Sequence, residues 1–84
     1  MDTLAPGMAE RIAARPAMSR GDWRGCIDAL RGAPPTLDVL SDRASCAHHA
    51  RDRAELERTC AALQRHHAGA PQAHACDGML LTLR

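Results

Sequence analysis

The feature that most limits how this chain can fold is a series of short amphipathic segments separated by Gly and Pro, which runs from Gly21 to Pro71. Apolar residues recur within each segment at the three- and four-residue spacing of an α-helix. Gly-Ala-Pro breaks at 32–34 and 69–71 bracket these segments, so the pattern predicts a helix, a turn and an antiparallel helical hairpin. A hairpin of this kind cannot bury both of its faces alone, so it stacks on another helical unit or holds a partner helix.

The same periodicity extends to both ends of the chain and predicts an all-α fold of about five helices in one domain over residues 1–84. The first helix is expected over residues 3–15. The second is expected between a cap at Asp22 and a left-handed C-terminal position at Gly32. Three further helices are expected over residues 37–51, 53–67 and 71–84.

Each predicted helix has an apolar stripe that marks its core face. The strongest stripe falls at i, i+3, i+4 and i+7 in the second helix and consists of Trp23, Cys26, Ile27 and Leu30. The other stripes are, in chain order, Leu4, Met8 and Ile12; Leu37, Leu40, Ala44 and Ala47; Leu56, Cys60, Leu63 and His67; and Ala73, Cys76, Leu80 and Leu83.

Local signals predict where these helices begin and end. Pro16 is expected to end the first helix, because its ring blocks helix continuation. Thr36 is expected to cap the third helix, and Asp52 with Glu55 resembles the capping box of the fourth. The charges at the start of the fourth helix indicate a solvated face; they are Arg53, Glu55, Glu57 and Arg58.

Composition limits both the core and the range of partners. The chain has no Phe or Tyr and one Trp among 84 residues, and much of its 45% hydrophobic fraction is Ala. The apolar area available for burial therefore barely offsets the conformational entropy lost on folding, and a partner is expected to supply stability. The formal net charge is +1, and the basic residues, all Arg, are dispersed among Asp and Glu, so no nucleic-acid binding is expected.

The four cysteines at positions 26, 46, 60 and 76 could form two bridges, but each occupies an apolar position of a predicted helix. We therefore expect reduced, buried thiols and a cytosolic protein. Residues 1–10 lack a basic leader and a long apolar core, and no segment approaches the roughly 20 apolar residues of a membrane span. Neither export nor membrane insertion is expected.

The Cys and His residues between positions 46 and 76 raise the hypothesis of a metal site, but paired spacings such as Cys-x2-Cys or His-x3-His are absent. No metal or cofactor is therefore expected. The chain also lacks a phosphate-binding glycine loop, a nucleophile elbow and a His-Glu-x-x-His motif, so it is expected not to be an enzyme. Two classes stay open: a helix-binding protein, and a small helical-bundle interaction or regulatory protein linked to Cys and His chemistry.

Two stretches resemble the tetratricopeptide repeat. Residues 21–23, Gly-Asp-Trp, followed by Cys26, Ala29 and Leu30, resemble its second helix, in which an aromatic residue follows two positions after a Gly. Residues 43–71 resemble one complete repeat, and the positions that carry this match are Cys46, Ala47, Ala50, Leu56, Thr59, Leu63 and Pro71.

The order of these elements over residues 21–84, which includes Gly78-Met79 near the end, is similar to the chaperones that bind the needle protein of type III secretion systems, the YscG and PscG type. The resemblance implies a short tetratricopeptide-like array of hairpins in a right-handed superhelical stack, with the helix at 3–15 peripheral to the core. It also implies a bacterial cytoplasmic chaperone that holds the amphipathic C-terminal helix of the needle subunit and prevents premature polymerisation. A small helical co-chaperone completes a heterotrimer in that family. The chain is shorter than these chaperones before Gly21, so one helix of the usual N-terminal hairpins is expected to be missing.

Partner contacts are expected on the inward faces of the third and fifth helices, where apolar side chains can receive the apolar face of a bound helix. The candidate partner-binding residues are Leu37, Leu40, Ala44, Met79, Leu80 and Leu83. The residues expected in the core are Trp23, Ile27, Leu30, Leu56 and Leu63.

Overall fold

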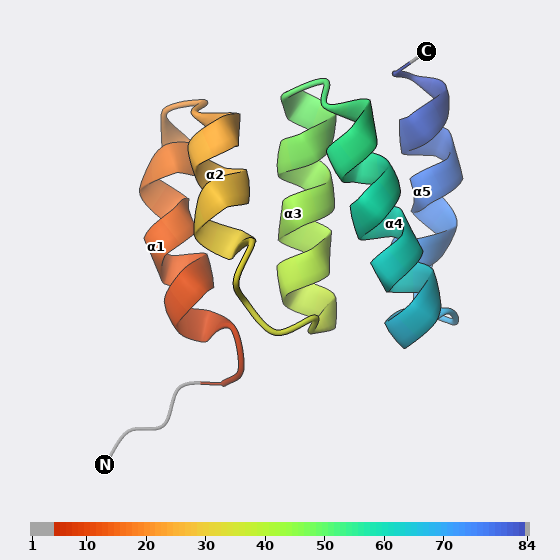
Figure 1. Cartoon of the computed structure of the whole chain (residues 1–84), viewed down its shortest axis with the longest axis horizontal. Helices are drawn as coiled ribbons and strands as arrows, with labels where there is room; N and C mark the ends of the chain where they lie inside the picture. The colour runs from red at the N-terminus through yellow and green to blue at the C-terminus, as the bar shows by residue number, and fades with distance from the viewer. Residues whose placement is uncertain (1–4, 84) are drawn as a thin grey trace.

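The computed structural model describes residues 5–83, and over this range it contains five α-helices and no strand. The helices are α1 (Met8–Ser19), α2 (Trp23–Leu30), α3 (Leu37–His49), α4 (Arg53–His67) and α5 (Pro71–Leu81). Helices α1 and α2 form one antiparallel hairpin and α3 and α4 form a second, with α5 beside α4 (Figure 1). The expectation of an all-α fold is confirmed.

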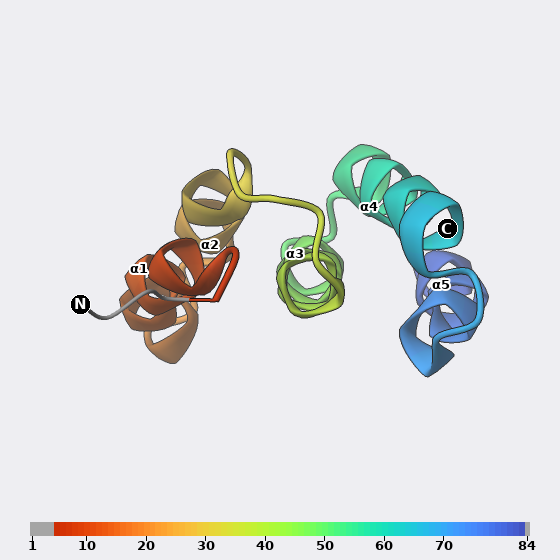
Figure 2. The same ribbon diagram turned by 90° about the horizontal axis from the view of Figure 1, so that it is seen from below.

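The helices lie in two rows, with α1, α3 and α5 in one row and α2 and α4 in the other (Figure 2). Helix α2 packs against α3 and α4 packs against α5, while α3 also contacts α1 and α5 directly. The molecule measures 45 × 30 × 17 Å, and its shortest dimension matches two layers of helices at about 8 to 10 Å each. One surface is therefore built by α1, α3 and α5 alone, and we call it the α1–α3–α5 face.

The two hairpin turns have the same geometry. Each contains one residue in the left-handed conformation, Gly21 with φ 74° and Arg51 with φ 56°. The next residue, Asp22 or Asp52, accepts an N–H bond from the first turn of the following helix at 3.0 Å. These turns lie 30 positions apart (51 minus 21), which is shorter than the 34-residue period of a tetratricopeptide repeat. The chain thus repeats one helical unit before it reaches α5.

Several predicted helix starts are confirmed, while two predicted helix ends, at Gly32 and at Pro16, are wrong. The Asp22 and Asp52 caps form as expected, and the Thr36 hydroxyl accepts the N–H of Val39 at 3.2 Å. The Glu55 half of the capping box does not form, because the N–H of Asp52 donates to the carbonyl of Ala47. Gly32, however, does not adopt the left-handed conformation: α2 ends at Leu30, and its C-cap residue Arg31 keeps ordinary helical geometry with φ −61°.

The first helix departs most from its prediction. Pro16 lies inside α1 and does not end it. Pro16 has no N–H to donate to the carbonyl of Ile12, four residues before it. Ile12 is 51% exposed, so water can donate a hydrogen bond to this carbonyl instead. The core face of α1 consists of Ala14 and Ala17, because small side chains allow α2 to approach closely. The predicted stripe through Ile12 is therefore wrong, while the part of the prediction at residues 3 and 4 lies outside the described range.

The core forms mainly from the stripes of α2, α3 and α4, as their spacing predicts. The large side chains that are almost completely buried include Ile27, Leu30, Leu40, Leu56 and Leu63. Trp23 is half-buried at the edge of this core, where its ring stacks on that of His49 with a centroid distance of 4.3 Å.

The prediction of a solvated face at the start of α4 is wrong for Glu55, whose side chain is 1% exposed. Arg43 of α3 donates to its carboxylate at 2.6 Å, and Arg58 donates to it at 2.8 Å. Burial acts to raise the pKa of Glu55, but the hydrogen bonds and charges of Arg43 and Arg58 outweigh it, so this pKa is lowered. Glu55 therefore stays ionised in the core and joins α3 to α4.

The cysteines differ from their prediction as well. Cys26 and Cys46 form one disulfide between α2 and α3, and Cys60 and Cys76 form another between α4 and α5. The expectation of reduced thiols is wrong, and the cysteine argument for a cytosolic location is lost with it. The sequence could not reveal this pairing, because it arises only when stripes on successive helices face each other with Cα atoms 6.3 and 5.8 Å apart.

A pair of glycine substitutions tests the packing of the N-terminal turn. Gly7 is buried at the start of α1 with φ 83°, and a Cβ added there would collide with Val39 of α3. We expect Gly7→Ala to lower the free energy of unfolding by about 1 to 2 kcal/mol, measured by urea denaturation. As a control, Gly78→Ala in α5, where an added Cβ meets nothing within 4 Å, is expected to raise it by about 0.5 to 1 kcal/mol. Shifts of equal sign would contradict this account.

Candidate functional site

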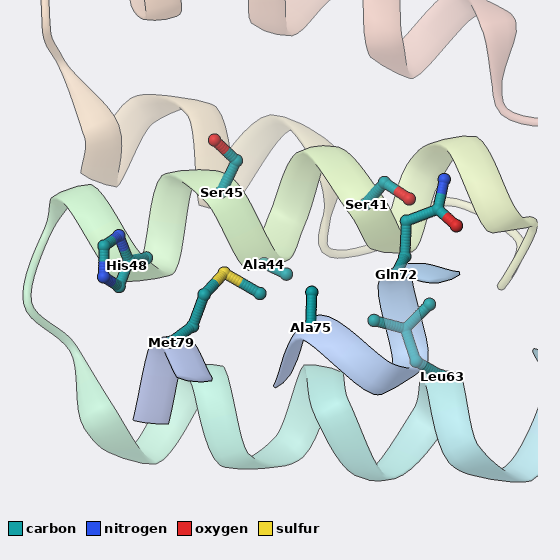
Figure 3. Close-up of a pocket in the computed structure, with 8 residues that line it drawn as sticks. All are labelled: Ser41, Ala44, Ser45, His48, Leu63, Gln72, Ala75 and Met79. Atoms are coloured by element: carbon teal, nitrogen blue, oxygen red, sulfur yellow. The ribbon is translucent and has the colours of Figure 1, made fainter. Parts of the chain in front are cut away.

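An apolar hollow lies between α3 and α5 on the α1–α3–α5 face (Figure 3). We call it the α3–α5 pocket and define it by its lining residues, Ser41, Ala44, Ser45, His48, Leu63, Gln72, Ala75 and Met79. Its volume is about 140 Å³, and most of its exposed lining is apolar. The pocket is thus a surface-accessible apolar site built by three helices.

The sequence of α3 explains why space remains here. The four lining residues of α3 fall at i, i+3, i+4 and i+7 from Ser41, so they form one stripe toward α5. Two serines and one alanine in that stripe are too small to fill the gap between the helices. From the other side, Met79 extends from α5 toward α3, while Ala75 leaves the middle of the pocket open (Figure 3).

Polar groups mark the two ends of the pocket. At one end, Nε2 of His48 lies 2.6 Å from the Thr82 hydroxyl, which itself donates to the carbonyl of Met79 at 2.7 Å. Because that hydroxyl proton is already used, His48 donates to Thr82 and ties the end of α3 to the end of α5. Gln72 lies near the other end, and its buried Oε1 has no hydrogen-bond partner among residues 5–83. Gln72 thus marks this end of the pocket with an unsatisfied polar atom.

A second hollow lies on the other side of α3, between α3 and α1, and has a volume of about 340 Å³. We call it the α1–α3 hollow; its lining residues are Arg11, Arg15, Met18, Ser19 and Asp42. Arg11 donates to Asp42 at 2.8 Å and lies 3.4 Å from Asp38. The hydrogen bond and charge of Asp42 raise the pKa of Arg11. Arg15 makes no ion pair within the described part of the chain, so it offers a positive charge in the α1–α3 hollow.

The structure separates the candidate partner-binding residues, and partner contact by any of them stays a prediction. Ala44 and Met79 line the α3–α5 pocket. Leu40 is 1% exposed and lies in the core, where an incoming helix cannot reach it. Leu37 and Leu83 are half-buried against the core.

Leu80 points to a different surface from Met79, although the two are adjacent in α5. It lines a hollow of about 300 Å³ between α4 and α5, which we call the α4–α5 hollow. The lining residues of this hollow are Glu57, Cys60, Ala61, Gln64, Cys76, Asp77 and Leu80. The predicted contacts on α5 therefore do not form one continuous surface.

Most residues of the α3–α5 pocket were not among the predicted binding residues, because large apolar side chains give the clearest binding signal in a sequence. The missed residues are Ser41, Ser45, His48, Leu63, Gln72 and Ala75, of which Leu63 was assigned to the core alone. One signal was available, since Ser41, Ala44 and Ser45 have helical spacing and little bulk. Such a stripe predicts a depression between helices.

The site offers no arrangement for metal binding. No group of three or more His, Cys, Asp or Glu side chains within residues 5–83 is placed to hold a metal ion. The four cysteines cannot serve as thiolate ligands while they are bonded in pairs. Within residues 5–83, no set of side chains is thus placed to act as the metal ligands that the metal-linked alternative requires.

No helix within residues 5–83 is long and apolar enough to cross a membrane. In comparisons with known proteins, no family model, no curated protein and no solved structure matches this chain.

Proposed function

We propose that this chain binds an amphipathic α-helix of a protein partner across the α1–α3–α5 face. The observation that carries the proposal is the α3–α5 pocket, because an apolar hollow between neighbouring helices is the kind of site that receives an apolar side chain of a bound helix. The polar ends of the pocket, at His48 and Gln72, would fix the position of such a helix.

The volume of the pocket limits the side chain that it can hold. A cavity of roughly 150 Å³ is large enough to bind benzene, and the α3–α5 pocket has about 140 Å³. One leucine or phenylalanine side chain is therefore a suitable anchor, whereas two such side chains would not fit.

The neighbouring α1–α3 hollow adds a charge preference. Packed helices lie about 8 to 10 Å apart, and a helix rises 1.5 Å per residue. At that spacing, a helix laid across α3 would carry groups over both hollows at positions about five to seven residues apart. With its apolar anchor in the α3–α5 pocket, the partner would place an acidic residue near Arg15.

Within this proposal, the partner class to test first is the needle protein of a type III secretion system. The tetratricopeptide-like sequence features support this choice, as does the pairing of α1 with α2 and α3 with α4. The chain would then act as a chaperone in the bacterial cytoplasm, with a small helical co-chaperone. Cytoplasmic thiols are kept reduced. The proposed mechanism therefore includes the question of whether the two disulfides are formed or open when the chain binds its partner.

The pocket can be tested at Ala75, which is exposed and lines it from α5. The probe is a synthetic peptide that corresponds to the C-terminal helix of a needle protein. We expect Ala75→Glu to weaken binding of this peptide by about thirtyfold, equivalent to about 2 kcal/mol, because it places a charge where the apolar anchor should sit. Binding would be measured by fluorescence anisotropy of the labelled peptide.

Ala54→Glu is the matched control, because Ala54 is exposed on α4 and lines none of the three hollows. It should leave the affinity unchanged. Equal affinity of Ala75→Glu and the parent would reject the pocket as the binding site. Failure of the parent to bind the needle helix would reject the chaperone proposal.

A further inference from the structure

The two disulfides have different access to solvent. Both residues of the first pair, Cys26 and Cys46, are 0% exposed and line none of the three hollows. The second pair, Cys60 and Cys76, is 5% and 2% exposed and lies in the wall of the α4–α5 hollow. That hollow, with a volume of about 300 Å³, has room for a small thiol reagent beside the second disulfide.

Helix α5 depends strongly on this second disulfide. It contacts only α3 and α4 among the described helices, and its fully buried residues are Ala73 and Cys76. Its other contacts are the half-buried Met79 and Leu80 against the core. Single hydrogen bonds add to them, such as Gln64 to the carbonyl of Ala73 at 3.1 Å and Arg53 to the carbonyl of Leu80 at 3.2 Å. An isolated helix of 11 residues is marginal in water, so little would hold α5 in place without the covalent bond.

We infer that the Cys60–Cys76 disulfide is a site of thiol–disulfide exchange with dithiols, and that its reduction releases α5 while the α1–α4 helices stay folded. A thiolate of the dithiol attacks one of the two cysteine sulfurs, the Cys60–Cys76 bond breaks, and the departing cysteine sulfur takes up a proton. The second thiol of the reagent then displaces the other cysteine. The products are two protein thiols and one cyclic disulfide, so two electrons and two protons pass from the dithiol to the protein.

Release of α5 would also remove one wall of the α3–α5 pocket, since α5 supplies Gln72, Ala75 and Met79. An effect on partner binding rests on the function proposed above. The exchange reaction itself does not, because it can be followed on the chain alone.

The test uses the oxidised chain and graded concentrations of dithiothreitol at neutral pH, with N-ethylmaleimide to block each free thiol and peptide mass spectrometry to locate it. Exchange requires access of the thiolate to sulfur, and the buried pair must wait for local opening of the core. We expect Cys60 and Cys76 to be labelled about tenfold faster or more than Cys26 and Cys46. Equal rates, or faster labelling of Cys26 and Cys46, would overturn the assignment.

Matched double variants test the release of α5. In Cys60→Ser/Cys76→Ser, amide hydrogen exchange should lose protection over residues 71–81 and keep it over residues 8–67. In Cys26→Ser/Cys46→Ser, residues 71–81 should remain protected as long as the fold persists under the same conditions. Retained protection of 71–81 in the first variant, or its loss together with that of 8–67, would show that the disulfide does not control α5 separately. None of these readouts involves a partner, so they stand apart from the binding test.

Discussion

Replacing Glu55 with alanine is expected to lower the free energy of unfolding by about 3 to 5 kcal/mol, which is the usual result of removing one member of a buried ion pair. Glu55 is 1% exposed and accepts hydrogen bonds from Arg43 and Arg58. The side chain of Arg43 is 16% exposed, and its Nε already lacks a partner within residues 5–83, so losing Glu55 would leave its charge poorly solvated. Urea denaturation followed by circular dichroism measures the change.

Two companions separate charge from volume in this experiment. Glu55→Leu combined with Arg43→Met should be more stable than Glu55→Leu alone, because the double variant removes the unpaired charge as well. The pKa of Glu55 is lowered in the folded state, so the ionised side chain stabilises the fold at pH values above the ordinary carboxyl pKa of about 4.3. This stabilisation is lost as the pH falls through the pKa of Glu55 in the folded state. Glu55→Gln should therefore lose part of the acid dependence. An unchanged acid profile would contradict the assigned role.

Removing the inner disulfide with Cys26→Ala/Cys46→Ala is expected to lower the free energy of unfolding by about 3 kcal/mol. The bond spans 20 residues and restricts the unfolded chain, and loops of that size yield stabilisation of this order. For a domain of this length, the melting temperature should fall by roughly 12 to 24 °C. Differential scanning calorimetry under non-reducing conditions measures both quantities.

The outer disulfide provides the comparison, because its span of 16 residues gives a similar effect on the unfolded chain. Cys60→Ala/Cys76→Ala should lower the main melting temperature less, since α5 can separate before the other helices unfold. A larger drop for the outer pair than for the inner pair would contradict the placement of Cys26–Cys46 at the centre of the core.

The features that the sequence predicts correctly are the local ones. The Asp22, Thr36 and Asp52 caps formed as predicted, because each acts on an N–H only three residues away. The stripes of α2 and α4 also became core, since their large apolar side chains leave few other arrangements. In α1 the same rules failed, because alanines form the buried face and exposed Ile12 leaves its carbonyl open to water.

The candidate site was less accessible to such reasoning, because it depends on which helices become neighbours. Glu55 looks like a surface residue until Arg43 of α3 is placed against it. Met79 and Leu80 look equivalent in the sequence but line hollows on different sides of α5. The pocket itself arises from small side chains on α3, and small side chains carry little signal until the opposing helix is known.

Both disulfides join the second helix of one hairpin to the next helix along the chain, and this arrangement has a mechanical consequence. A pulling force applied to the two ends of the oxidised protein would pass directly from Cys26 to Cys46 and from Cys60 to Cys76. The bypassed segments, with spans of 20 and 16 residues, would carry no load. At roughly 3.5 Å per extended residue, they correspond to hidden contour lengths of about 70 and 56 Å. Most of α3 and the C-terminal part of α4 would therefore be shielded from tension until the bonds are reduced.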